Sequence, residues 1–311
     1  MQDLFSLVQT ALELGLISSL TVLALFLSYS MLGVCDLSTD GCFTLGAAVG
    51  AVVAIAGFPY LSLFAAMGAG ILSGFVTAIL QTKMGINSLL AGIIVNTGLY
   101  SINIAVMGNA SQLNLNKVET IFTDLKELLD DTFLAKQYKL IVALFVVALA
   151  VVLLVLFLRT RIGNAIRATG DNPVMVRSSS ISPTLTTVVG LCAANALTGL
   201  SGCLLAQSQK SVNIDIGSGM VTIALASLLI GNTLAGKKKI AFRAVGAVLG
   251  AFLFRLVYTV ALRFNMPAFL LKLVSAVIVV LAISIPYLKS QFPYFKRRLE
   301  LRKRKDGGKN A

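Results

Sequence analysis

The sequence predicts an all-α fold, a polytopic bundle of about eight or nine transmembrane helices, two of them broken or re-entrant. Three observations support this prediction. Of the 311 residues, 57% are hydrophobic and only 13% are charged, whereas a soluble domain has about 25% charged residues. The mean hydropathy is +0.89. The apolar residues also gather in runs that approach the roughly 20 residues needed to cross a bilayer core.

Nine such runs occur along the chain. The first has no basic segment before it and is too long for a signal peptide, so we expect it to remain as a membrane helix. Two others, 42–57 and 219–236, are short for a full span, which is typical of broken or re-entrant helices. The nine runs are residues 8–32, 42–57, 58–81, 86–107, 138–158, 183–208, 219–236, 244–262 and 268–288.

Basic residues gather on one predicted side of the membrane. If all nine runs cross, 18 of the 26 Lys and Arg residues fall on that side, at Lys83, in the loops 159–182 and 237–243, and in the tail 289–311. Cytoplasmic loops carry an excess of Lys and Arg. We therefore expect a bacterial plasma-membrane protein with its C-terminus in the cytoplasm and its N-terminus outside. The loop 108–137, with five of the thirteen acidic residues, then lies outside.

The domain organisation follows from the same charges. We expect one transmembrane domain over residues 1–290 and a basic cytoplasmic tail over 291–311. The tail reads KRRLELRKRKDGGK from Lys296 and is attracted to anionic membrane lipid. Binding to nucleic acid is not expected, because no folded domain accompanies the tail.

The outer loop contains a predicted amphipathic helix over residues 116–131. Asn116 followed by Glu119 has the spacing of an N-terminal capping box. Apolar residues at helical spacing follow, from Val118 to Leu129. This helix either packs as a lid on the membrane domain or meets an external partner.

The two short segments resemble each other. The first begins DLSTDGCFTLGA at Asp36 and the second DIGSGMVTIALAS at Asp215. The predicted topology places these starts toward opposite sides of the membrane, as in an inverted repeat, and transporters often place binding sites at broken helices of such repeats. The polar residues at the two starts either cap the helices or line the substrate path: Asp36, Ser38, Asp40, Asp215 and Ser218.

The segment 86–107 carries polar residues on one face. Asn96, Tyr100 and Asn103 are spaced at three and four residues, so they lie together on a helix. A face exposed to lipid disfavours such residues. They either form hydrogen bonds between helices or belong to the substrate path.

Several function classes lack the residues that they need. The chain has no His, which excludes His-based acid–base catalysis and Ser–His–Asp triads. The sequence GNTLAGK at 231–237 has the glycine and lysine spacing of a phosphate-binding loop, but Lys238 replaces the required Ser or Thr. We therefore predict no enzymatic activity and no metal site. Four cysteines without CxxC spacing are interpreted as small buried side chains: Cys35, Cys42, Cys192 and Cys203.

The cytoplasmic loop 159–182 is the most informative part of the sequence. It reads RTRIGNAIRATGDNPVMVRSSSIS and mixes basic with apolar residues. We expect a short helix that ends near Gly170, a turn at 171–173, and a second short helix. The turn is expected because proline disfavours a helical conformation in the residue before it.

This loop resembles the coupling helix of ATP-binding-cassette (ABC) importer permeases, in the superfamily that includes branched-chain amino acid and ribose permeases. GNAIRATGDNP is its most specific phrase, and DLSTDGCFTLGA resembles the DLS-x-G segment of that superfamily. The resemblance covers about residues 10–288 in order. Within the superfamily, residues 89–108 are similar to permeases paired with lipoproteins thought to bind tryptophan or tyrosine.

The resemblance implies how the work is divided among subunits. Two copies of the chain would form the pathway, and two cytoplasmic ABC ATPase subunits would dock on the coupling loops. An extracytoplasmic substrate-binding protein would deliver the solute, an amino acid with an aromatic one favoured. This chain would bind no cofactor, since ATP and Mg²⁺ would sit on the partner ATPase. The positions implied to contact the ATPase are Gly163, Ala165, Arg167, Ala168, Gly170, Asp171, Asn172 and Pro173.

Two other interpretations remain open at this point. An ion-coupled secondary transporter would need functional carboxylates in the membrane, and only Glu13, Asp36, Asp40 and Asp215 are available. The same ABC permease role could also serve branched-chain amino acids, sugars or nucleosides.

Overall fold

The computed structural model describes residues 2–128, 137–236 and 239–263, together with isolated residues between 273 and 284. The described part is an all-α polytopic bundle, which confirms the predicted fold class. Six of its helices are long and apolar enough to cross a membrane. They are α1 (Gln2–Leu25) with its continuation η1 (Phe26–Met31), α3 (Pro59–Thr82), α4 (Ser88–Val106), α6 (Tyr138–Arg159), α9 (Pro183–Gln209) and α11 (Ile240–Arg263).

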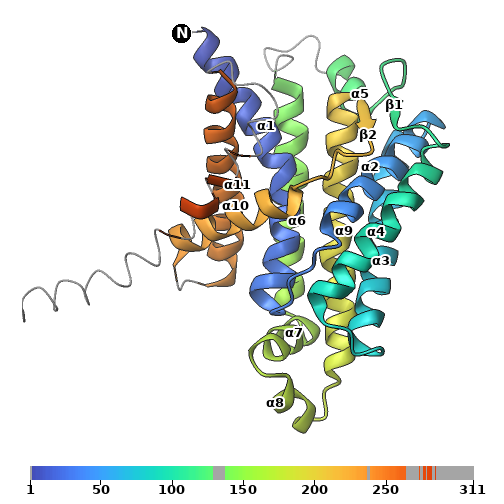
Figure 1. Cartoon of the computed structure of the whole chain (residues 1–311). Coiled ribbons are helices and arrows are strands. Elements are labelled where there is room, and N and C mark those ends of the chain that lie inside the picture. The colour runs from blue at the N-terminus through green and yellow to red at the C-terminus, as the bar shows by residue number, and fades with distance from the viewer. Residues whose placement is uncertain are drawn as a thin grey trace, which may run out of the picture.

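Two shorter apolar helices correspond to the short segments of the sequence. They are α2 (Thr39–Ile55) and α10 (Met220–Ala235), of 17 and 16 residues. At 1.5 Å per residue each is about 25 Å long, less than the roughly 30 Å of a hydrocarbon core. Both begin inside the bundle rather than at its ends (Figure 1). The ninth predicted segment, 268–288, and the tail 291–311 lie outside the continuously described residues.

The order of elements matches an inverted repeat. In Figure 1, α1 runs from the N-terminal end of the bundle toward α7 (Arg161–Asp171), whereas α9 runs from the α7 end back toward β2 (Ser211–Asn213). Each of these long helices is followed by an irregular break, a short helix and another long helix. The two halves therefore present the same sequence of elements in opposite directions.

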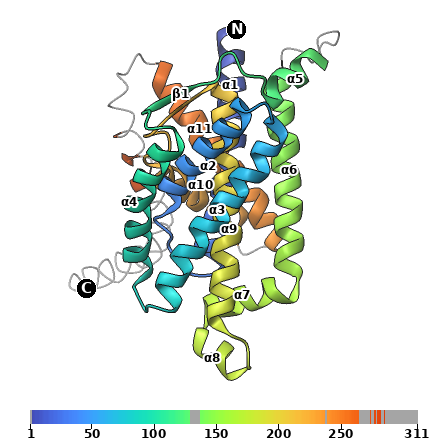
Figure 2. The same ribbon diagram turned by 90° about the vertical axis from the view of Figure 1, so that its right-hand side faces the viewer.

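Helix α9 lies at the centre of the bundle, with α3 beside it (Figure 2). A Cβ atom placed on Gly46 of α2 would overlap the backbone of Gly199 in α9. This close approach requires glycine, as is common where membrane helices pack tightly. The glycines thereby bring α2 from the first half against α9 from the second.

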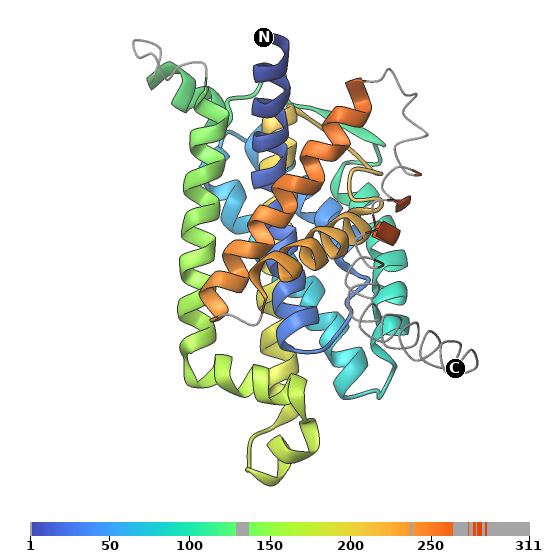
Figure 3. The same cartoon turned by 90° about the vertical axis from the view of Figure 1, so that its left-hand side faces the viewer.

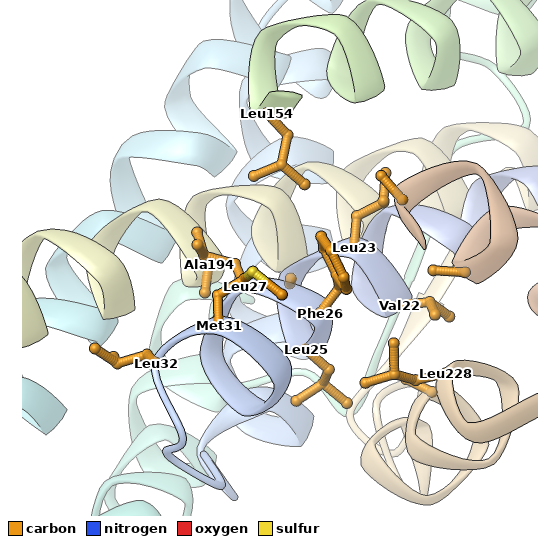
Figure 4. Packing of buried hydrophobic residues seen from close by; sticks show 14 of the residues in the cluster. Val22, Leu23, Leu25, Phe26, Leu27, Met31, Leu32, Leu154, Ala194 and Leu228 are labelled. Carbon is orange, nitrogen blue, oxygen red and sulfur yellow. The ribbon is translucent and has the colours of Figure 1, made fainter. Parts of the chain in front are cut away.

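The largest apolar cluster lies where α1 and η1 meet α6, α9 and α10. Phe26 and Leu27 are fully buried there, against Leu154, Ala194 and Leu228 (Figure 4). Figure 3 shows α10 and α11 crossing this side of α1. Burial of this apolar surface holds the first broken helix between elements of both halves.

The outer loop corrects one prediction. The helix α5 (Ile121–Leu128) begins at Ile121 and not at Asn116. Thr120 caps it by accepting from Thr123 N at 3.3 Å. The helix starts late because β1 (Gln112–Asn114) pairs with β2. The residues after β1 form a turn, in which Leu115 N donates to Lys210 O. Phe122 of α5 is buried on the bundle, so the described part of the loop packs as a lid.

The two ends of the bundle carry the elements that the charge pattern assigns to opposite sides. The N-terminus, α5, β1 and β2 lie at one end, while α7 and α8 (Pro173–Ser178) lie at the other (Figures 1 and 2). This separation agrees with the predicted topology. Which end faces the cytoplasm stays a prediction.

Candidate functional site

A polar cavity of about 450 Å³ lies between α2, α4 and the connection that joins α9 to α10. It combines residues that are far apart in the sequence and that come from both halves of the repeat. Six of the eight predicted pathway residues line it, whereas Asp36 and Ser38 do not. The lining consists of Asp40, Gly41, Thr44, Asn96, Thr97, Tyr100, Ser101, Asn103, Ile214, Asp215 and Ser218.

Asp40 joins the two short helices. It stands in the first turn of α2, yet its carboxylate accepts from Gly219 N at 3.0 Å and from Val221 N at 2.8 Å. Those two N–H groups belong to the start of α10, where no earlier turn can satisfy them. A Cβ on Gly217 would overlap the Asp40 carbonyl, so the two chain segments are in direct contact. Asp40 is therefore a cap, as one of the two interpretations of the sequence expected, but it caps the helix of the opposite repeat.

Asp36 belongs to a separate buried network. Its side chain is 1% exposed and accepts from Ser38 N at 2.8 Å, Ser38 Oγ at 2.6 Å and Asn195 Nδ2 at 2.9 Å. Thr77 Oγ1 of α3 donates to Ser38 Oγ at 3.3 Å. These bonds fix the irregular segment before α2 to α9 and α3. Asp36 and Ser38 thus hold the first break in place and do not reach the cavity.

The polar face of α4 both bonds to a neighbouring helix and lines the cavity. Asn103 is 1% exposed and its Nδ2 donates to Gly41 O of α2 at 3.2 Å, a hydrogen bond between helices. Asn103 also lines the cavity, with Asn96 and Tyr100. Tyr100 is 52% exposed. One face of α4 therefore both attaches to α2 and forms a wall of the cavity.

The loop 159–182 folds into the two short helices α7 and α8, as expected. Thr160 Oγ1 caps α7 by accepting from Gly163 N at 3.2 Å. The side chain of Asn172 caps α8 by accepting from Val174 N at 3.0 Å and Met175 N at 3.1 Å. Pro173 occupies the first turn of α8, where its missing N–H costs nothing.

The predicted ATPase contacts divide into two groups. Gly163 is buried, and a Cβ on it would overlap the backbone of Phe157. A Cβ on Gly170 would overlap the Met31 carbonyl at the end of η1. These two glycines pack against the membrane domain, and Gly170 is half-buried whereas Gly163 is buried. Ala168, Asp171, Asn172 and Pro173 are exposed, while Ala165 and Arg167 are half-buried.

Two exposed apolar side chains of α8 are absent from the set that the sequence predicted. Met175 is 67% exposed and its neighbour Val174 still more so, while Val176 beside them is buried. The signal was present in the sequence as the apolar run PVMV at 173–176 within a basic loop. The surface around Val174 and Met175 is called the α8 surface below.

The described part of the chain offers no metal-ligating cluster of three or more His, Cys, Asp or Glu residues. The sequence resembling a phosphate-binding loop starts inside α10, where Gly231 packs against Gly246 of α11. That backbone is helical at Gly231 and cannot form a phosphate-binding loop there.

Comparison with known proteins identifies the family. Residues 7–283 match the family described as "Branched-chain amino acid transport system / permease component". The chain belongs to this permease family. This result confirms the resemblance seen in the coupling loop and the DLS segment. The chain is accordingly an ABC-type permease and a multi-pass membrane protein.

Two curated relatives of this permease span most of its length. A tyrosine transport system permease protein of Clostridioides difficile (strain R20291) is 31% identical over 267 residues, which cover 86% of each chain. An uncharacterized protein of Rickettsia prowazekii (strain Madrid E) is 28% identical over 281 residues, covering 88% of this chain and 96% of the relative. No solved structure gives a significant match.

Proposed function

We propose that this permease forms the translocation pathway of an ATP-driven importer for an amino acid, with an aromatic amino acid as the favoured substrate. The cavity between α2, α4 and the α9–α10 connection would be part of that pathway. Cytoplasmic ATPase subunits would dock on α7 and α8, and a second copy of the chain would complete the pathway. An extracytoplasmic binding protein would deliver the substrate.

The observation that carries the proposal is the α8 surface. Met175 and Val174 belong to α8, which lies with α7 at one end of the bundle (Figure 1), and they are among the most exposed apolar side chains of the described residues. Exposed apolar side chains that gather at one place mark interaction sites. Since α8 lies in a loop that the charge pattern assigns to the cytoplasm, a cytoplasmic protein is the partner that fits it.

The packing of α7 supplies a route from such a partner to the pathway. Gly170 lies against the Met31 carbonyl and is in contact with Gly33, at the first break. From there the chain reaches Asp36 and then α2, whose Asp40 caps α10 beside the cavity. A displacement of α7 by the ATPase would therefore act on the start of α2 through direct contacts, which is how rigid packed elements carry coupling.

The choice of an aromatic amino acid as the substrate rests on one relative and on the sequence. The relative from Clostridioides difficile is described as a tyrosine transport protein, and residues 89–108 are similar to permeases of the tryptophan and tyrosine type. Tyr100 adds an exposed aromatic ring to the cavity wall.

Reconstitution of the complete system tests the proposal. The permease, its ATPase and its binding protein are placed in liposomes, and uptake of labelled L-tyrosine is followed with and without ATP on the ATPase side. We expect uptake that requires ATP and is unaffected by collapse of proton and sodium gradients. Uptake driven by an ion gradient without ATP would overturn the proposal in favour of a secondary transporter. Competition by L-leucine, ribose or adenosine in place of L-tyrosine would reassign the substrate.

A matched pair of variants tests the docking surface. Met175 and Met84 are both 67% exposed, and Met84 follows α3 in the turn that leads to α4. Met175→Glu should abolish co-purification of the ATPase, because a charge would be buried in the contact. Met84→Glu should leave it unchanged. Equal co-purification with the two variants would count against docking on α8.

A further inference from the structure

The cavity between α2, α4 and the α9–α10 connection is acidic. Asp40 and Asp215 line it, and its described lining contains neither Lys nor Arg. The sequence has no His that could add a positive charge. A bound anion would therefore meet two carboxylates without a balancing cation, whereas a cation would be attracted by both.

The helix starts beside the cavity do not reverse this preference. Helix N-termini ordinarily attract anions through their free N–H groups. In this chain Asp40 already accepts from Gly219 N and Val221 N, and Met220 N donates to Gly217 O. At the start of α2, Asp36 accepts from Ser38 N. The protein's own oxygen atoms thus occupy the first N–H groups of α10 and the Ser38 N–H that precedes α2.

Two acceptors of the wall have no donor in the described part of the structure. Asn103 is 1% exposed, and its Oδ1 is buried without a hydrogen-bond partner, although its Nδ2 donates to Gly41 O. The exposed carboxylate of Asp215 likewise receives no hydrogen bond from any described group. A buried acceptor without a partner can accept a further hydrogen bond, so Asn103 Oδ1 is open to a donor.

We propose that this cavity recognises the primary ammonium group of the transported amino acid, with Asp215 as its counter-charge and Asn103 Oδ1 as a further acceptor. The inference rests on the proposed permease function and adds the chemical group that the pathway selects. A primary ammonium has three N–H donors and one positive charge. It therefore matches a wall with two carboxylates and an unpaired amide oxygen. Tyr100 would contact the rest of the substrate from α4.

A series of three probes separates the ammonium from the carboxylate of the substrate. L-Tyrosine carries both groups, tyramine lacks the carboxylate, and 3-(4-hydroxyphenyl)propanoate lacks the ammonium. Competition against labelled L-tyrosine is measured on the purified permease–ATPase complex in lipid nanodiscs, without the binding protein, so that only the pathway selects. We expect tyramine to compete about as well as L-tyrosine and the propanoate about tenfold or more weaker. Equal or better competition by the propanoate overturns the inference, as does the absence of any L-tyrosine binding at millimolar concentration.

Substitutions of Asp215 provide a second test of the same inference. Asp215→Asn keeps the size of the side chain and removes the charge, so the advantage of tyramine over the propanoate should fall by about tenfold. Asp215→Glu should retain the advantage. Glu119→Gln is the control, because it makes the same change of charge on an exposed residue of the outer loop that does not line the cavity. An unchanged ratio in Asp215→Asn would overturn the role of Asp215.

The uptake assay of the complete system distinguishes the two proposals. If ATP-driven uptake of L-tyrosine occurs but the Asp215→Asn complex still prefers tyramine over the propanoate, the permease function stands and ammonium recognition by Asp215 fails. If ATP drives no uptake of any amino acid, the proposed function itself fails.

Discussion

The two breaks in the helix bundle begin with similar sequences and are held very differently. The first break precedes α2, and its Asp36 is buried and receives three hydrogen bonds, one of them from Asn195 of α9. The second break precedes α10, and its Asp215 is exposed at the cavity with no donor among the described groups. The N–H groups at the start of α10 are satisfied by Asp40, from the first half.

This difference indicates that the two breaks have different roles. The first break connects α7 to α2, because Gly170 packs on Met31 and Asp36 bonds to Ser38. The second break places the Asp215 carboxylate at the cavity. The helix that follows it, α10, is capped by Asp40 from the first half. An acidic residue at an equivalent place in a repeat is therefore structural in one half and free for a ligand in the other.

The largest effect should come from Asp36→Ala. The change leaves the buried donors of Ser38 and Asn195 unpaired, at about 1–3 kcal/mol for each group. We expect a strongly lowered unfolding temperature in detergent and little protein in the membrane. Asp215→Ala is the comparison and should stay within about 0.5 kcal/mol of the unchanged protein, because that side chain is exposed. Equal losses of thermal stability in the two variants would contradict this difference between the breaks.

Gly217→Ala should have the next largest effect. Its new methyl group would overlap the Asp40 carbonyl and push the two breaks apart, which typically costs about 1–3 kcal/mol. We expect lower thermal stability together with loss of uptake. Gly98→Ala in α4 is the control, since nothing lies within 4 Å of a Cβ at that position. A stable and active Gly217 variant would contradict the contact between the halves.

Gly170→Ala tests the link between the first break and α7. The added methyl group would displace α7 from Met31 without touching the exposed α8 surface. Coupling free energies of about 1–3 kcal/mol correspond to about 5–150-fold, so uptake should fall within that range while ATPase co-purification persists. Gly68→Ala in α3, which has open space around its Cβ, serves as the control. Loss of the ATPase itself would show that Gly170 acts in docking and not in transmission.

The smallest of these effects should come from Asp40→Ala. Removal of a helix cap costs about 1 kcal/mol, less than the loss of the buried Asp36 network, because water in the cavity can replace the cap. We expect a small decrease in unfolding temperature by calorimetry. A decrease as large as that of Asp36→Ala would place both carboxylates in one structural unit.

Much of the bundle was predictable from local patterns. Hydropathy located the helices, and the short runs 42–57 and 219–236 correspond to α2 and α10. The turn between α7 and α8 followed from Pro173, which fixes its own backbone and restricts Asn172. The start of α5 was mispredicted, because the chain just before it is held by strand β2, about a hundred residues further along the sequence.

The sequence by itself determined which segments enter the membrane, where the helices break and which loop resembles a coupling helix. These properties depend on hydropathy, proline and charge, which act over a few residues. Only the tertiary structure decided that Asp36 is a buried anchor, that Asp40 caps α10 and that Asp215 is left without a donor. Asn195 is 159 residues from Asp36, and Gly219 and Val221 are 179 and 181 residues from Asp40. A carboxylate takes its role from the donors that surround it, and here folding brings Asn195 to Asp36, and Gly219 and Val221 to Asp40, from the other half of the chain.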